Sequence, residues 1–65
     1  MQMTYQGKST ETDAATVGEF LASVGIGKGE AVVEYNGEIL GAANVAATLL
    51  TEGAELNAYR IVAGG

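Results

Sequence analysis

Residues 31–40 read Ala-Val-Val-Glu-Tyr-Asn-Gly-Glu-Ile-Leu, and this stretch carries the clearest structural pattern of the chain. The residues before Asn36-Gly37 alternate between two faces, as in a strand that is buried on one side. A two-residue turn of type I′ needs positive φ at both central positions, which Asn followed by Gly adopts readily. We therefore predict a β-hairpin with strands over 31–35 and 38–40.

A short amphipathic helix is predicted before this hairpin. Thr16-Val17-Gly18-Glu19 fits a capping box, in which the Thr16 hydroxyl and the Glu19 carboxylate each accept a hydrogen bond from the other's backbone N–H. One apolar stripe follows at the spacing i, i+3, i+4 and i+7: Val17, Phe20, Leu21 and Val24. Gly25 stands where a left-handed C-terminal cap is needed, so the helix should run from 16 or 17 to 24. Because so short a helix is not stable alone, its stripe must lie against a sheet.

A second hairpin is predicted at the start of the chain. Met1, Met3 and Tyr5 alternate with polar residues, which is the pattern of a half-buried strand. Gln6-Gly7 can turn the chain into a returning strand over 8–12.

The last third of the chain is predicted to supply the final strand. Residues 41–52 are rich in alanine, and we expect a helical turn or two over 45–50. A strand follows over 55–62, with Leu56 and Ala58 facing the core and the side chains of 59 and 61 on the opposite face. One helix against one sheet is an α+β domain.

The composition excludes most catalytic and metal chemistry. The 65 residues include no cysteine, histidine, tryptophan or proline. The chain therefore has no thiolate nucleophile, no imidazole base and no zinc–cysteine cluster. Its eight acidic residues are scattered without the spacing of a calcium-binding loop. We expect no catalytic residue, no metal site and no bound cofactor, and a small binding or carrier domain rather than an enzyme.

The charge points to protein partners. Three basic residues stand against eight acidic ones, for a net charge of −5. Nucleic-acid binding is not expected, because phosphate neutralisation needs a cationic face. The start of the chain lacks the features of a signal peptide, and the longest weakly polar stretch, 40–50, is far shorter than the ~20 residues of a membrane helix. We expect a cytoplasmic protein without membrane contact, monomeric when free and bound by basic-surfaced proteins.

The C-terminus is the candidate reactive site. Ala63-Gly64-Gly65 follows the last strand directly, so we expect a domain over 1–62 and a flexible tail over 63–65. Residues with little or no side chain, here Ala63 and Gly64, can thread through a cleft that excludes larger ones. The Gly65 carboxylate is a poor electrophile, so a partner would first convert it to an acyl-adenylate with ATP. The alternative is an interaction module of the same fold whose glycines are only a loose end.

Several segments resemble the ubiquitin-like sulfur carriers, and the similarity is greatest to the thiamine-pathway carriers. The segments are 1–7, 16–21, 33–40 and 53–65, so the resemblance covers nearly the whole chain in order. The resemblance implies a ubiquitin-like β-grasp fold. That fold has a mixed sheet of four to five strands, with the first and last strands parallel at its centre and one main helix packed on one face.

The resemblance also implies chemistry at the tail. In this family a ubiquitin-activating-type adenylyltransferase uses Mg-ATP to adenylate the terminal glycine, here Gly65. Sulfur from a cysteine desulfurase or a rhodanese-like donor then gives a thiocarboxylate. The carrier delivers this sulfur to a synthase, which for the thiamine-pathway carriers is thiazole synthase.

The sequence leaves the acceptor of the sulfur open. Gly41-Ala42-Ala43 stands where the thiamine-pathway carriers have Pro-Arg, and Ala54 stands where an aspartate is common. Related carriers feed cysteine, homocysteine or molybdopterin precursors through another sulfur-accepting synthase. A ubiquitin-like protein modifier, with Gly65 joined to a lysine, is a further alternative.

The end of the last strand is the predicted docking surface for these partners. Tyr59 and Ile61 should form an exposed apolar patch beside Arg60 and the acidic rim, and Val62 leads into the tail. An aromatic and an arginine among apolar residues are typical of an interface centre. The alternatives are a half-buried Tyr59 without a partner and an Arg60 that pairs with a glutamate across the sheet.

Overall fold

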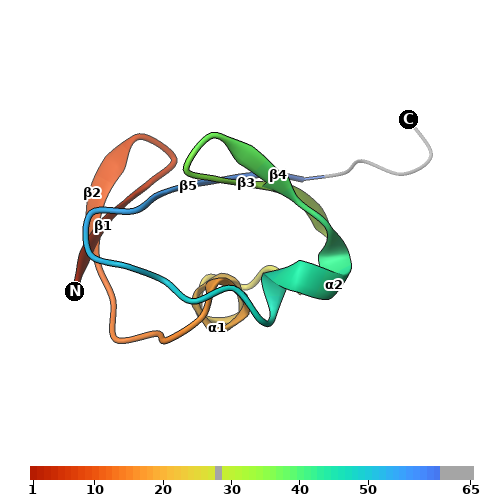
Figure 1. The fold of residues 1–65 in the computed structure, drawn as a ribbon, viewed down its shortest axis with the longest axis horizontal. Helices are drawn as coiled ribbons and strands as arrows, with labels where there is room; N and C mark the ends of the chain where they lie inside the picture. Colours follow the sequence, from red (N-terminus) through yellow and green to blue (C-terminus); the bar gives the residue numbers. More distant parts are fainter. Residues whose placement is uncertain (28, 61–65) are drawn as a thin grey trace.

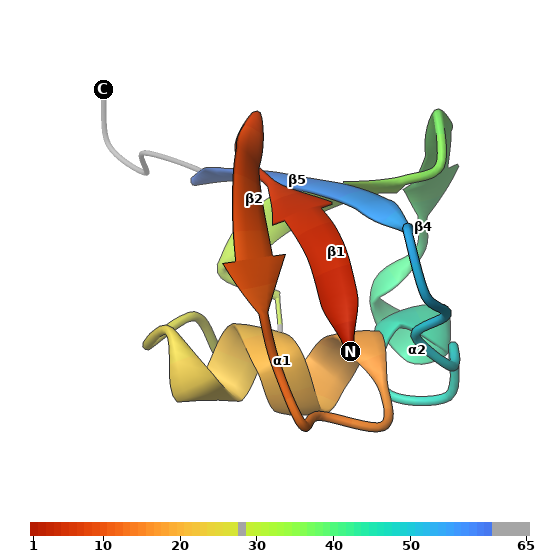
Figure 2. The same cartoon turned by 90° about the vertical axis from the view of Figure 1, so that its left-hand side faces the viewer.

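The computed structural model describes residues 1–27 and 29–60. Within these ranges the chain forms five strands and two short helices. In chain order they are β1 (Gln2–Tyr5), β2 (Lys8–Glu11), α1 (Val17–Ser23), β3 (Ala31–Tyr35), β4 (Glu38–Leu40), α2 (Ala42–Val45) and β5 (Glu55–Arg60). The strands make one curved sheet, and α1 crosses one of its faces (Figures 1 and 2).

The sheet is mixed, and β5 lies at its centre. Its strand order is β2-β1-β5-β3-β4. β1 pairs with β5 in parallel, whereas the other three pairings are antiparallel. The first and last strands are therefore central neighbours, and the helix covers one face. The predicted β-grasp fold is confirmed.

Both predicted hairpins are present, and each turns through two residues with positive φ. The values are 53° and 79° at Gln6 and Gly7, and 51° and 87° at Asn36 and Gly37. This left-handed pair is the backbone of a type I′ turn. The two hairpins lie on opposite sides of β5, and their tips are well separated (Figure 2).

Helix α1 is capped at its start largely as predicted. The Thr16 hydroxyl accepts a hydrogen bond from the Glu19 N–H at 3.1 Å. The Glu19 carboxylate reaches one residue further back than predicted, because it accepts from the N–H of Ala15 at 2.8 Å and not from that of Thr16. The cap therefore still satisfies two backbone donors at the helix start.

The end of α1 corrects one member of the predicted apolar stripe. Gly25 has the expected positive φ of 85°. The Ile26 N–H then donates to the Leu21 carbonyl at 2.8 Å, which closes a Schellman motif. Because α1 ends at Ser23, Val24 turns outward and is 41% exposed, and Ile26 is buried instead.

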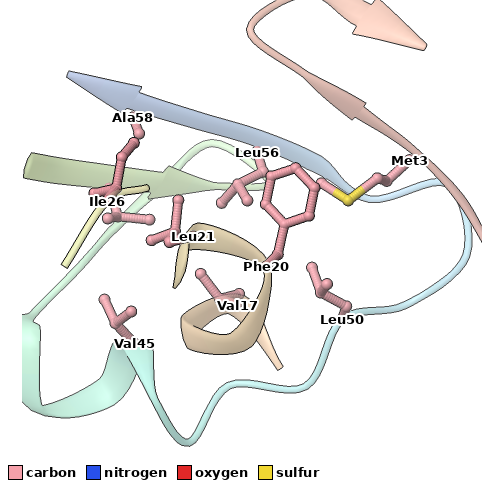
Figure 3. Packing of buried hydrophobic residues seen from close by; sticks show 10 residues of the cluster. Met3, Val17, Phe20, Leu21, Ile26, Val45, Leu50, Leu56 and Ala58 are labelled. Carbon is pink, nitrogen blue, oxygen red and sulfur yellow. The ribbon is translucent and has the colours of Figure 1, made fainter. Parts of the chain in front are cut away.

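A single apolar cluster fills the space between α1 and the sheet. Its buried members come from both helices, three strands and the segments between them (Figure 3): Met3, Val17, Phe20, Leu21, Ile26, Val33, Val45, Leu50, Leu56 and Ala58. The inward direction predicted for Leu56 and Ala58 is confirmed. The Phe20 ring meets the half-buried Tyr5 ring edge to face, with centroids 4.9 Å apart.

The second helix lies earlier in the chain than predicted. It covers Ala42–Val45, whereas the expected position was 45–50. The residues that follow it pair with the start of α1: the Val17 N–H donates to the Thr48 carbonyl and the Leu50 N–H donates to the Ala15 carbonyl, both at 2.9 Å. These long-range bonds hold the segment extended, so a helix there would lose them.

Candidate functional site

The central strand β5 leads directly into the predicted reactive tail. Tyr59 and Arg60 are its last two residues and the last that the structure describes. The other predicted site residues lie outside the described part of the chain: Ile61, Val62, Ala63, Gly64 and Gly65. The geometry of the site is therefore that of the sheet surface from which the tail departs.

Tyr59 lies on the outer face of the sheet, the face turned away from α1. In the sheet register Tyr59 lies opposite Val32. Two residues further along β3, Glu34 lies between Asn57 on β5 and Ile39 on β4. Tyr59 is 54% exposed, Val32 40% and Ile39 64%. We call these three residues the outer-face patch.

The exposure predicted for Tyr59 is confirmed, and its role in binding a partner stays a prediction. The sequence analysis did not include Val32 and Ile39 in the docking surface. The alternation around Val33 could have shown Val32 to be outward, but the neighbour relation of Ile39 depends on the sheet register.

A carboxylate holds the polar side of this face together. Glu34 Oε1 accepts a hydrogen bond from Asn57 Nδ2 at 3.1 Å and receives the Tyr59 hydroxyl at 3.5 Å. The second distance is long for a hydrogen bond between two oxygens, so this contact restrains the Tyr59 ring only weakly. An apolar group with an adjacent carboxylate suits a partner surface that offers apolar side chains next to a cation.

Arg60 is exposed at the end of β5. The residue opposite it on β3 is Ala31 and not a glutamate. Arg60 follows the outward-facing Tyr59 on β5, so its side chain starts on the opposite face of the sheet, the face that α1 covers, as does that of Ala31. The sequence analysis placed Arg60 beside the Tyr59 patch, and the alternation along β5 corrects this.

The helix side of the sheet carries an apolar groove. It lies between α1, β3, β4 and α2, has a volume of about 440 Å³ and is bordered by Leu21, Val33 and Leu40. Two polar residues at its rim, Thr16 and Glu19, are engaged in capping α1. Among the described residues that line the groove, Glu19 alone has a titratable side chain, so they form no acid–base pair.

No group of three or more His, Cys, Asp or Glu side chains in 1–27 and 29–60 is placed to hold a metal ion. No helix in those ranges is long and apolar enough to cross a membrane.

Comparison with known proteins identifies the family. The model of the ThiS family matches residues 2–65. The chain belongs to the ThiS family. The match includes the terminal glycines, so the ThiS resemblance extends over both the fold and the tail.

Two solved structures from Geobacter metallireducens are similar to this ThiS family member. One is the crystal structure of a thiamine biosynthesis protein (ThiS), with 29% identity, full coverage of both chains and a TM-score of 0.80. The other is the solution structure of a thiamine biosynthesis protein, with 30% identity, 100% of this chain and 88% of that chain covered, and a TM-score of 0.78. No curated protein matched the chain.

Proposed function

We propose that this protein is the sulfur carrier for thiazole formation in thiamine biosynthesis, and that its Gly65 carboxylate carries the sulfur as a thiocarboxylate. The observation that carries the proposal is the ThiS family match over residues 2–65, which includes the Gly-Gly end. The similar Geobacter metallireducens structure, a thiamine biosynthesis protein, supports the same pathway.

The chemistry takes place in two steps on a partner enzyme. The Gly65 carboxylate attacks the α-phosphorus of Mg-ATP, pyrophosphate leaves, and an acyl-adenylate forms. A sulfur nucleophile then attacks the acyl carbon, and AMP leaves with its C–O bond electrons. When sulfide is the nucleophile the products are the thiocarboxylate, AMP and a proton. Mg-ATP belongs to the adenylyltransferase, so the carrier itself needs no bound cofactor and no catalytic residue.

The carrier contributes recognition and presentation. The outer-face patch offers a docking surface beside the end of described β5, where the exposed Arg60 adds a positive charge. Three partners would bind this surface in turn: a ubiquitin-activating-type adenylyltransferase, a sulfur donor of the desulfurase or rhodanese-like kind, and thiazole synthase. Ala63 and Gly64 allow the tail to pass into clefts that would exclude larger side chains.

The proposal is tested by intact-mass measurement of the full chain. We expect incubation with a ubiquitin-activating-type adenylyltransferase, Mg-ATP and sodium sulfide to raise the mass by the difference between one sulfur and one oxygen. Deletion of Gly65 should abolish this change. Gly41→Ala is the matched control, because an added Cβ there meets nothing within 4 Å and the backbone does not need positive φ.

A second measurement identifies the acceptor. The thiocarboxylate form, mixed with thiazole synthase and its other substrates, should return to the carboxylate mass as sulfur enters the product. An unreactive Gly65 would overturn the carrier function altogether. Transfer to a different synthase, or lysine-linked conjugates in cells, would overturn the thiazole assignment in favour of another acceptor or a protein modifier.

A further inference from the structure

A side chain continues the pairing of β5 after β1 has ended. The parallel ladder begins with the Thr4 N–H donating to the Ala54 carbonyl at 2.8 Å and continues with the Gln6 N–H donating to the Leu56 carbonyl at 3.1 Å. At the next step the Gln6 side chain takes over. Its Nε2 donates to the Ala58 carbonyl at 2.7 Å, and its Oε1 accepts from the Ala58 N–H at 3.0 Å. We call this the Gln6–Ala58 pair.

The pair satisfies backbone groups that would otherwise lack a strand beside them. The register of β1 against β5 stops at Tyr5 and Leu56, because the chain turns back into β2 at Gln6. Ala58 is only 5% exposed, so an unpaired N–H and carbonyl there would be costly. One primary amide supplies both a donor and an acceptor and so replaces the missing strand at this position.

The turn amide of the other hairpin bonds to the opposite end of β5 and makes only one hydrogen bond there. Asn36 occupies the equivalent turn position, and its Oδ1 accepts from the Glu55 N–H at 2.8 Å at the start of β5. Asparagine tolerates the left-handed backbone better than glutamine does. Gln6 adopts nearly the same φ as Asn36, although glutamine suits this backbone less well. Its extra methylene lets the side-chain amide reach Ala58.

We propose that Gln6 is a positioning residue for the reaction at the C-terminus. The proposal rests on the proposed function, and Gln6 would affect that reaction only indirectly, through the position of β5. Ala58 lies two residues before the end of described β5, so the Gln6–Ala58 pair sets the direction in which Tyr59 and Arg60 continue toward the tail. Without the pair, only β3 would hold this end of the strand. The end of β5 would then sample a wider range of positions, and a smaller fraction of molecules would be ready to dock.

The test compares two amide residues in equivalent turns. Gln6→Asn suits the left-handed turn but is one methylene too short for the pair. Asn36→Gly is the matched control, because it also suits its turn and removes a side-chain bond to β5, but at the end far from the tail. Both variants are assayed for pyrophosphate release with a ubiquitin-activating-type adenylyltransferase, Mg-ATP and sulfide, and amide hydrogen exchange of Ala58 is followed in parallel.

We expect Gln6→Asn to raise the KM for the carrier by about three- to tenfold, the factor that one or two net hydrogen bonds correspond to. The kcat should change by less than about twofold, since the reacting atoms are unaltered. Exchange at Ala58 should accelerate by about tenfold. Asn36→Gly should leave KM, kcat and the Ala58 exchange rate close to wild type.

Two results would overturn the inference. The first is an unchanged KM in Gln6→Asn, whether or not kcat falls, and the second is an equal KM increase in Asn36→Gly. Gln6→Gly, which favours the turn further, repeats the test should the asparagine variant unfold. Failure of the wild-type chain to release pyrophosphate would instead overturn the proposed function, and the inference with it.

Discussion

A single exposed ring dominates the outer face of the sheet. Tyr59 is 54% exposed and lies opposite Val32, and its hydroxyl is 3.5 Å from the Glu34 carboxylate. An exposed tyrosine contributes little to folding but offers a large, rigid surface to a partner. We therefore expect Tyr59 to matter for binding rather than for stability.

This argument predicts separate effects of substitution at Tyr59. Tyr59→Ala should raise the KM of the adenylyltransferase for the carrier by about tenfold or more, as expected of a central interface aromatic. The melting temperature should change little because the ring is largely solvated. Tyr59→Phe keeps the ring and gives up only the 3.5 Å hydroxyl contact, so its KM should stay near wild type. A Tyr59→Ala carrier with wild-type KM would show that partners dock elsewhere.

Among the elements, α1 and the C-terminal end of α2 lie in close contact at a glycine. A Cβ added to Gly18 would lie 3.0 Å from Ala46 Cα and 3.5 Å from the Val45 carbonyl oxygen. Both are backbone atoms, so no side chain can rotate away to make room. The sequence shows Gly18 only as part of the capping motif, and the contact with the residues after α2 becomes visible only in the fold.

Gly18→Ala is therefore predicted to lower stability although alanine is the better helix former. Helix propensity alone would favour the alanine by about 1 kcal/mol. We expect the clash with Ala46 to outweigh this gain, so that the midpoint of urea unfolding falls. Ala22→Gly, at an exposed site in the same helix, is the control for propensity and should cost about 1 kcal/mol. A Gly18→Ala variant more stable than wild type would mean that α2 yields readily.

The elements that could be predicted are those specified by neighbouring residues. Asn36-Gly37 contains its own turn conformation, and Thr16 with Gly25 marks the two ends of α1, so these features agree with the structure. The position of α2 was wrong because residues 48–50 bond to residues 15–17, a contact that no local pattern encodes. The prediction that Val24 belongs to the apolar stripe was wrong, because α1 ends at Ser23, one residue before the last position of that stripe.

At the scale of the whole molecule, the candidate site was only partly predictable for a related reason. The C-terminal glycines and Tyr59 stand out by composition and alternation along one strand. Ile39 and Gln6 belong to other strands or turns, and only the sheet register brings them to the outer face or to Ala58. Sites assembled across a sheet need the pairing of strands that are distant in sequence.

The net charge of the molecule gives a final prediction about how it meets its partners. A 65-residue chain with a net charge of −5 produces a negative field around a small surface. Such a field accelerates encounter with a basic-surfaced protein and weakens as salt shortens the screening length, which is about 10 Å at 0.1 M. We expect the association rate with the adenylyltransferase to fall by about tenfold between low and high salt.

The dissociation rate separates this long-range effect from docking at the patch. It should change little with salt, because apolar contacts around Tyr59 and Ile39 are insensitive to screening. Tyr59→Ala should show the reverse pattern, with faster dissociation and an unchanged dependence of association on salt. Stopped-flow association at several salt concentrations measures both rates. An association rate independent of salt would contradict electrostatic steering and leave the outer-face patch as the main determinant of partner choice.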